Sequence, residues 1–448
     1  MILAKPNGPG HGPSRNGDFL TGPVTDRRRK PVLRRVIALT AAFLLTGLAS
    51  LLPAAPAHAG DSAFSTWLAQ QWPEAEKMGI SRRTFDAVTR NLQPDLSLPD
   101  LILSGKPDRD EPGQAEFVRT PAEYLSEKSL SRLAAYGRQL QKEHASTLAT
   151  IEKRFGVPST MVLAIWGRET DFGRYKLPNN ALTALATQAY TGRRKETFLP
   201  EFLYAIKMVD DGYVKADNFP ASWAGATGLT QFMPSEYYKY AVDLDGDGRA
   251  NIWGSVPDAL ASAAKQLAGK GWEKGKHWAY EVRAPKAVDC TIAEPSHTMP
   301  LSEWLKRGYV PAFGRKPTAA ELADPHSLLL PAGIYGPAFL ISKNYFVIKD
   351  YNFSDLYVLF VGNLHDRIAE GRGFEAKWRT VAQLHTRDLE DMQKRMTELG
   401  LYREKIDGKA GMKTRAALGA YQKANNLTLD CWPTNTVLTH MRKRVGQR

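Results

Sequence analysis

Residues 156–173 read GVPSTMVLAIWGRETDFG and give the strongest structural signal in the chain. Pro158 and Ser159 are typical of the first turn of a helix. Glu169 lies four residues after Ile165, so both side chains share one helix face and the acid extends an apolar stripe. The segment therefore predicts a helix with one apolar, buried face that carries a carboxyl group near its C-terminal end.

The predicted surroundings of Glu169 suit an acid that donates a proton. Burial disfavours the charged carboxylate, and the C-terminal end of a helix carries partial negative charge, so both effects favour the neutral carboxyl group. A general acid that works near neutral pH needs this form. The alternative is a solvated glutamate at a helix end. Asp171 lies two residues further on and faces another side of the helix, so we expect it to have a structural role.

Three further motifs follow this helix. Residues 221–235 read ASWAGATGLTQFMPS, residues 243–251 read DLDGDGRAN and residues 351–354 read YNFS. Together with ETDFG at residues 169–173, these four signals in this order resemble the lytic murein transglycosylase B family, over about residues 62–372. The resemblance implies a mainly α, lysozyme-like catalytic domain of the α+β class in which helices dominate.

The resemblance also implies a reaction. Glu169 would be the single catalytic acid/base and would protonate the oxygen of the β-1,4 bond between N-acetylmuramic acid and N-acetylglucosamine in peptidoglycan. It would then take the proton of the muramic C6 hydroxyl, which attacks C1 and forms a 1,6-anhydro end. Most glycosidases instead place two carboxyl groups around the bond. Two alternatives stay open: a hydrolytic muramidase of the same bond, and a non-catalytic scaffold that binds the wall.

Five residues match site positions of the family, and Tyr190 is a further candidate for the cleft. Ser222 would orient the acid, with a helix cap as its alternative, and Gln231 would contact the sugar. Aromatic rings stack on sugar faces and amides bind hydroxyl or acetamido groups, although tyrosines at this spacing are often core residues. The expected substrate-binding residues are Ser222, Gln231, Tyr351, Asn352, Tyr357 and Tyr190.

The acidic loop at residues 243–251 follows the EF-hand pattern, with oxygen ligands at alternate positions and a glycine at the sharp turn. The loop departs from that pattern at Gly254, where a bidentate glutamate is expected. The family closes a longer loop with a later aspartate, here Asp258. The expected ligands of a structural calcium ion are Asp243, Asp245, Asp247, the Arg249 carbonyl and Asp258. The alternative is an acidic turn braced by lysines, and the chemistry itself is expected to need no cofactor.

The last part of the chain has its own apolar periodicity. It resembles the peptidoglycan-binding-type-1 domain, a small three-helix module, through Ile406-Asp407-Gly408, Gly411-x-x-Thr414-Arg415 and Tyr421-Gln422. Most of these residues are expected to build the fold, because Asp-Gly makes a turn and Thr414 lies at a helix start. The predicted organisation is a catalytic domain at residues 60–374, a linker at 375–383 and a wall-binding domain at 384–448.

Residues 1–59 predict a cleavable secretory leader. Basic residues within 27–35 precede an apolar run from Val36 to Leu52, and the small-residue site Ala57-His58-Ala59 follows. The run is shorter than the ~20 residues that a spanning helix needs, and an uncleaved anchor is the alternative. No cysteine follows the run. We therefore expect a periplasmic protein that is neither a lipoprotein nor stably inserted in the membrane.

Charge and cysteine content narrow the partners. The formal net charge is +13, and the part that lies outside the leader is a modest surplus that suits an acidic polymer such as peptidoglycan. No dense Lys/Arg tract follows the leader, so nucleic acid is not an expected partner. In an oxidising compartment the two cysteines, Cys290 and Cys431, either pair and tie the two domains together or stay separate thiols; the sequence leaves both open.

Overall fold

The computed structural model describes residues 59–103, 119–382 and 384–445. The predicted leader therefore lies outside the described residues, apart from Ala59. The described chain from Ala63 onward belongs to one compact unit. Among the described residues, no helix is long and apolar enough to cross a bilayer.

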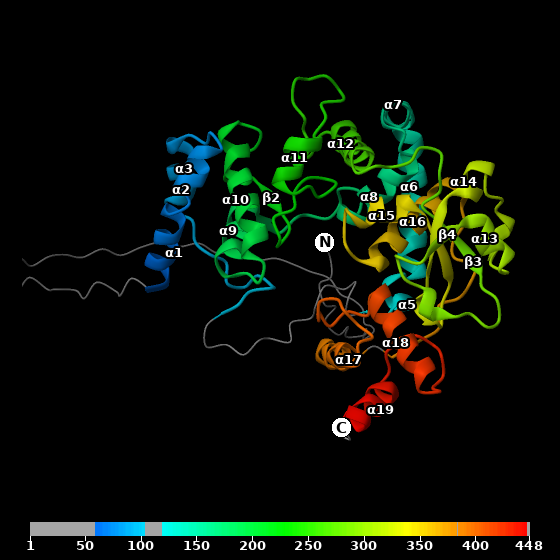
Figure 1. The fold of residues 1–448 in the computed structure, drawn as a ribbon. Coiled ribbons are helices and arrows are strands. Elements are labelled where there is room, and N and C mark those ends of the chain that lie inside the picture. Colours follow the sequence, from blue (N-terminus) through cyan, green and yellow to red (C-terminus); the bar gives the residue numbers. More distant parts are fainter. Residues whose placement is uncertain (1–58, 104–118, 383, 446–448) are drawn as a thin grey trace, which may run out of the picture. The chain divides into compact units, whose positions relative to one another are not determined.

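Helices dominate the described chain, which confirms the mainly α prediction (Figure 1). Its first part consists of α1 (Ala59–Ala69), α2 (Trp72–Lys77), α3 (Arg82–Thr89), α5 (Pro121–Tyr124), α6 (Glu127–Glu143), α7 (Ala145–Phe155), α8 (Ser159–Thr170), α9 (Ala181–Thr191), α10 (Lys195–Asp210), α11 (Pro234–Tyr240) and α12 (Val256–Gly269). Two short strands in this part, β1 (Asn179–Asn180) and β2 (Pro220–Ala221), pair antiparallel with each other.

Helix α8 is the central element of the largest core. Every residue of α8 except Ser159 and Arg168 is buried, because α6, α7, α12 and α16 pack around it. A helix that is apolar on all sides is typical of such a position, so the burial is more complete than the predicted single stripe. Gly167 is required here, since a Cβ at this position would lie 2.6 Å from the Phe172 ring.

The irregular part of the sequence forms a small antiparallel sheet with the order β4-β6-β8-β3-β5. The strands and short helices of this part are β3 (Ala279–Arg283), η1 (Cys290–Ile292), β4 (Thr298–Pro300), α13 (Leu301–Lys306), β5 (Val310–Pro311), η2 (Ala312–Gly314), α14 (Ala319–Ala323), β6 (Pro325–Leu329), β7 (Pro331–Ile334) and β8 (Ala338–Ile341). Trp304 and Tyr280 anchor a separate apolar cluster beneath the sheet. After β8 the chain returns to the main core through α15 (Lys343–Lys349) and α16 (Asp355–Glu370).

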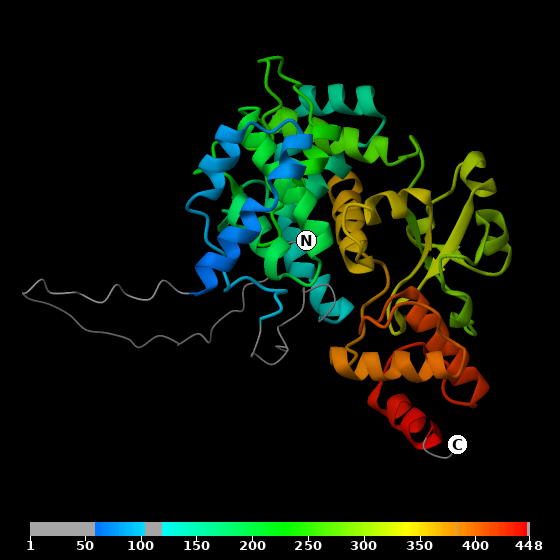
Figure 2. The ribbon, with the colours of Figure 1, turned by 60° about the vertical axis from the view of Figure 1, so that its left-hand side comes forward.

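The last three helices form a small bundle with its own core, as predicted, and gather at one end of the compact unit (Figure 2). They are α17 (Thr386–Glu398), α18 (Met412–Ala424) and α19 (Asn435–Val445). The buried Gln393 holds the predicted turn, because its Oε1 accepts the N–H groups of Asp407 and Gly408 over 3.0 and 2.9 Å.

A disulfide joins Cys290 to Cys431, with their Cα atoms 6.1 Å apart. It links η1 of the sheet region to the segment between α18 and α19. Of the two alternatives that the sequence left open, pairing is the one present. Gly419 of α18 packs directly against this disulfide, because a Cβ there would overlap the Cys431 sulfur.

Candidate active site

Glu169 lies in the last turn of α8 and is buried, with 2 % of its surface exposed. The helix ends just beyond it because Asp171, Phe172 and Gly173 have positive φ angles of 51°, 58° and 78°. This left-handed run turns the chain back, and the Phe172 ring packs edge-on against Trp166. The carboxyl group therefore does not point into bulk water, as a general acid role requires.

One hydrogen bond holds the Glu169 carboxyl group. The Tyr357 hydroxyl, from the first turn of α16, donates to Oε1 over 2.5 Å. Burial, followed by the charge of Glu169, raises the pKa of the Tyr357 hydroxyl well above its usual value, so the group remains a donor. Oε2 makes no hydrogen bond to any described residue, yet it is not one of the buried polar atoms without a partner. This second oxygen therefore keeps access to solvent.

Tyr357 differs from its predicted role as a substrate contact. Its side chain is fully buried, with 0 % exposed, so it offers no surface to a sugar. The ring is covered by α8 residues and faces Tyr351, whose ring lies parallel at a centroid distance of 6.5 Å. The geometry instead assigns Tyr357 to the support of Glu169.

Ser222 also differs from its prediction. In the described structure its Oγ accepts the N–H groups of Ala224 and Ala226 over 3.3 and 3.1 Å, and it makes no hydrogen bond to Glu169. Ser222 thus stabilises the first turn of the 221–235 loop by accepting backbone N–H groups. This role is closer to the predicted alternative, a cap, than to contact with the acid. Tyr357 occupies the position at Glu169 that the resemblance gave to this serine.

The 221–235 loop and the segment around Tyr351 meet at the acid. The Tyr351 hydroxyl donates to the Thr230 carbonyl over 2.5 Å. Thr170, the neighbour of Glu169, donates to the Leu229 carbonyl over 2.7 Å. Sequence reasoning missed Thr170: the motif marks its position, but only the fold supplies its partner. Three segments far apart in the sequence thus converge on Glu169.

Gln231 shows two signs of functional constraint. Its φ angle is 58°, a strained region for a residue with a side chain. Its Nε2 donates to the Gly228 carbonyl over 2.8 Å, but its buried Oε1 has no partner among the described residues. Buried polar atoms are normally paired, so this unpaired acceptor suits a ligand that brings a hydroxyl or an amide N–H.

The other two predicted contacts lie in different places. Asn352 is buried beside Tyr351, and its Oδ1 accepts the Ser354 N–H over 3.1 Å. Tyr190 belongs to α9 and packs against Phe64 and Trp67 at centroid distances of 5.1 and 5.2 Å. The structure therefore brings Asn352 to the site segment and places Tyr190 with the N-terminal helices.

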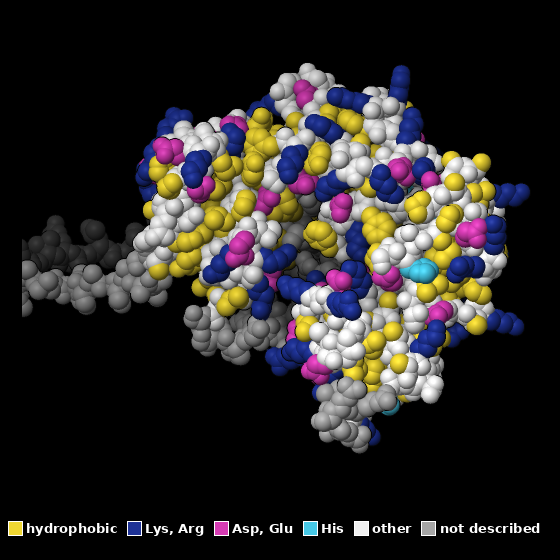
Figure 3. Space-filling model, in the orientation of Figure 1, with side chains coloured by type: hydrophobic (Ala, Val, Ile, Leu, Met, Phe, Trp, Pro, Cys, Tyr) yellow, Lys and Arg dark blue, Asp and Glu magenta, His cyan; other side chains and the backbone are white. Residues whose placement is uncertain are grey.

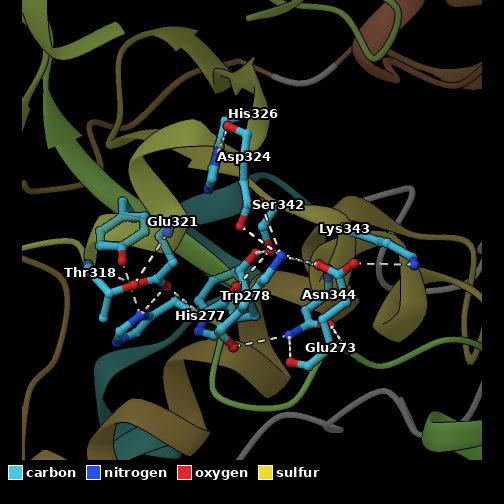
Figure 4. A network of polar contacts seen from close by, with 12 residues as sticks. Glu273, His277, Trp278, Thr318, Glu321, Asp324, His326, Ser342, Lys343 and Asn344 are labelled. Carbon is cyan, nitrogen blue, oxygen red and sulfur yellow. Dashed lines mark hydrogen bonds and ion pairs between the residues drawn. The ribbon is translucent and has the colours of Figure 1, made fainter. Parts of the chain in front are cut away.

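A polar network fixes the start of α15, the helix that leads to Tyr351 (Figure 4). Ser342 caps α15: its Oγ accepts the Asn344 N–H over 3.1 Å and donates to the His277 carbonyl over 2.6 Å. The Asn344 side chain accepts the Glu273 N–H over 2.7 Å and donates to the Glu273 carbonyl over 2.9 Å. The loop before the sheet and the helix after it are thereby held together.

The face drawn in Figure 3 is hollowed between the region of α9 and β2 and that of α15. Hydrophobic, basic and acidic side chains all lie around this recess. Concave sites with apolar walls and a few polar groups are typical of ligand binding.

The acidic loop brings three of its predicted ligands together. One carboxylate oxygen from each of Asp243, Asp245 and Asp258 lies within 4.8 Å of the others. Asp258 is fully buried in the first turn of α12, and its two oxygens accept the N–H groups of Leu244 and Asn251, each over 2.8 Å. Hard oxygen donors gathered in this way fit a calcium ion.

The Asp247 carboxylate lies outside this group, and the predicted role of the Arg249 carbonyl stays a prediction. Asp247 Oδ1 accepts the Arg249 N–H over 2.8 Å, and the Arg249 guanidinium donates to the Gly212 carbonyl over 2.8 Å. The EF-hand spacing predicted Asp247 as a ligand. In the structure its carboxylate instead accepts a backbone N–H of the same loop, and Asp258 of α12 joins Asp243 and Asp245.

The fold and the site define a lysozyme-like protein in which helices dominate, joined to a three-helix bundle. The family described as "Transglycosylase SLT domain" matches residues 63–366, and "Putative peptidoglycan binding domain" matches residues 386–441. The first match covers more than half of the chain, so the chain belongs to the transglycosylase SLT family.

Relatives of known structure support this assignment. SltB3 from Pseudomonas aeruginosa, in complex with NAG-anhNAM-pentapeptide, is 36 % identical with a TM-score of 0.75; the match covers 85 % of this chain and 99 % of SltB3. The Escherichia coli lytic transglycosylase Slt35, in complex with calcium, is 25 % identical with a TM-score of 0.55, over 69 % and 93 % of the two chains.

A curated relative matches over a shorter stretch. Membrane-bound lytic murein transglycosylase B of Escherichia coli K12 is 42 % identical over 122 residues, which is 27 % of this chain. The chain spans 34 % of the length of that relative.

Proposed function

We propose that this protein is a lytic transglycosylase that cleaves the β-1,4 bond between N-acetylmuramic acid and N-acetylglucosamine in peptidoglycan, with Glu169 as the single general acid/base. The observation that carries the proposal is the buried Glu169 carboxyl group, held at Oε1 by Tyr357 and open at Oε2. SltB3, which aligns over nearly its whole length, binds an anhydro-sugar of the kind that this reaction forms.

In the first step, neutral Glu169 gives its proton to the bridging oxygen of the glycan. Because Tyr357 donates to Oε1, the solvent-accessible Oε2 is the oxygen that faces substrate. As the bond breaks, the Tyr357 hydrogen bond stabilises the carboxylate that forms. This carboxylate then accepts the proton of the muramic C6 hydroxyl, whose oxygen attacks C1. The proton returns to Glu169, and no water is consumed.

The carboxylate nearest to Glu169 along the chain, Asp171, is not free to act, because it is paired with the guanidinium groups of Arg132 and Arg174, each at 2.9 Å. These contacts fix the left-handed turn after α8 and fit the structural role that was predicted for Asp171. A two-carboxylate hydrolase would need an unpaired partner across the bond, so the geometry favours the single-acid reaction.

Substrate binding is assigned to the residues around the acid. Gln231 has an unpaired buried acceptor, and Tyr351 and Asn352 lie on the segment that joins the 221–235 loop to α16. Muramic and glucosamine residues carry acetamido N–H and hydroxyl donors, which the Gln231 Oε1 would accept.

A structural calcium ion belongs to the same proposal. Asp243, Asp245 and Asp258 would hold it, and the calcium complex of Slt35 supports this assignment. The ion would neutralise the clustered carboxylates of the loop between α11 and α12. It would take no part in proton transfer.

The proposed location is the periplasm, after secretion by the leader at residues 1–59. The Cys290–Cys431 disulfide supports an oxidising compartment. The proposed organisation keeps the catalytic domain at 60–374, the linker at 375–383 and the wall-binding domain at 384–448, which tethers the cleft to its polymer and raises its effective concentration there.

Purified sacculi distinguish the three candidate functions. The protein is expected to release muropeptides that end in anhydro sugars, which mass spectrometry detects as one water lighter than hydrolysis products. Reducing ends would show a muramidase. Sacculi that bind the protein but release nothing would show a scaffold.

A further inference from the structure

Helix α18 of the wall-binding bundle lies against the rest of the compact unit along one face. Met412, Arg415, Gly419 and Lys423 follow one another at helical spacing and share that face. Met412 is buried in the main core with α8 and α16, and Gly419 packs against the disulfide. Lys423 pairs with Asp289 at 2.9 Å. The bundle is thus docked by apolar contacts, a covalent link and charge.

Arg415 is the buried charge of this face. Its guanidinium lies 3.3 Å from the Asp355 carboxylate, and both side chains are less than a tenth exposed. The same carboxylate accepts the Tyr345 hydroxyl over 2.7 Å and the Lys349 ammonium over 2.5 Å. Burial would raise the pKa of Asp355, but the charges of Lys349 and Arg415 hold it at about 2, so Asp355 is an anion at neutral pH.

Asp355 is the first residue of α16, two residues before Tyr357. The N-terminal cap of α16 also contacts Tyr357, because Ser354 Oγ accepts the backbone N–H groups of Leu356 and Tyr357 over 3.2 and 3.4 Å. Whatever fixes the start of α16 therefore also fixes the Tyr357 hydroxyl, which lies 2.5 Å from Glu169 Oε1. The wall-binding bundle supplies one of the three groups that fix it.

We propose that Arg415 of the wall-binding bundle is a positioning residue for the catalytic acid, because it holds the start of α16 through Asp355 and so holds Tyr357 against Glu169. The inference rests on the proposed role of Glu169. It gives the bundle a second task besides tethering: the active site reaches its productive geometry only when α18 is docked. Arg415 itself touches no reacting atom.

The test uses the full chain and two variants that break the pair from opposite sides. Arg415→Met removes the cation, and Asp355→Asn removes the anion while it leaves the Arg415 contact to the Ala410 carbonyl within the bundle. For both, kcat on sacculi is expected to fall about two- to thirtyfold, the range of coupling through a packed network. KM and sedimentation with sacculi should not change.

Lys423→Met is the matched control: it breaks another ion pair across the same face, away from α16, and should keep the kcat of the wild type.

A double-mutant cycle separates positioning from a general loss of structure. In a Tyr357→Phe background, Arg415→Met should cause no further fall in kcat, because the group through which it acts is already gone. Losses that multiply, or an Arg415→Met chain with the kcat of the wild type, would overturn the inference. Glu169→Gln in the same assay distinguishes the two failures: if it stays active the proposed function is wrong, and if it is inactive while Arg415→Met is fully active only the positioning role is wrong.

Discussion

Two buried carboxyl groups lie close to the same helix start and have opposite surroundings. Glu169, at the C-terminal end of α8, has one tyrosine hydroxyl as its partner and no ion pair among the described residues. Asp355, at the N-terminal end of α16, has Tyr345, Lys349 and Arg415. The helix dipole favours an anion at the second place and disfavours it at the first. Burial alone does not decide how a carboxyl group is held: two cations and a hydroxyl make Asp355 a fixed anion, whereas Glu169 has a single hydroxyl donor.

The largest expected effect comes from Glu169→Gln, which keeps the shape of the side chain and removes its proton transfer. The rate of anhydromuropeptide release should fall at least ~100-fold, the lower range for general acid catalysis. Binding to sacculi should persist. Asp171→Asn is the matched control at the same helix end. Because the Asp171 carboxylate is already paired with arginines, the rate should fall only a few-fold. A large fall in rate would mean that Asp171 is a second catalytic acid.

Tyr357→Phe removes the only described hydrogen bond to Glu169 and leaves the buried ring in place. A hydrogen bond to a charged group contributes about 1.5–3 kcal/mol, so kcat should fall about 10- to 100-fold. KM should change little, because the ring has no exposed surface. Steady-state kinetics on soluble glycan strands measure both values. A change in KM alone would mean that Tyr357 contacts the substrate instead of supporting Glu169.

Asp355→Asn tests the other carboxyl group through stability. The pKa of Asp355 is about 2 in the folded protein against an ordinary 3.8, so its contribution is complete above about pH 4 and disappears as the pH falls towards 2. The shift corresponds to about 2 kcal/mol of unfolding free energy. Urea unfolding at several pH values should show a weaker acid dependence in the variant. An unchanged dependence would mean that Asp355 is not the fixed anion of the pair.

A third buried carboxylate, Asp258, differs from both, because it lies with two other acids and fits a metal ion rather than an arginine. Calcium at ten times its Kd should stabilise the wild type by about 1.4 kcal/mol, measured as a rise in Tm relative to a sample with chelator. Asp258→Asn should abolish this calcium response. If calcium does not raise the Tm of the wild type, the loop is an acidic turn that does not bind the ion.

Local patterns predicted the parts of the site, and the fold supplied the contacts between them. The helix at 156–173 and its acid follow from spacing over a few residues, which a 3.6-residue period determines. The motifs at 221–235 and 351–357 mark the other two segments. In the acidic loop, Asp258 closes from α12 onto Asp243 and Asp245, as the resemblance implied, and calcium binding there stays a prediction.

Partners that are distant in the sequence could not be predicted. The Tyr357 hydroxyl meets Glu169 across 188 residues, and Cys290 meets Cys431 across 141. The pair of Asp355 and Arg415 joins two domains. Periodicity says which face of a helix is buried, but which side chains meet there depends on how whole elements pack. For this reason Ser222 was predicted to hydrogen-bond the acid, whereas the described hydrogen bond to Glu169 comes from Tyr357.

In the proposed reaction one carboxyl group gives a proton and takes it back, while the sugar supplies its own nucleophile. Cleavage of purified sacculi in water enriched in heavy oxygen distinguishes this reaction from hydrolysis. We expect the new muramic ends to be anhydro sugars without any heavy oxygen. Heavy oxygen at C1 of those ends would show that water attacks there and that the proposed reaction is wrong.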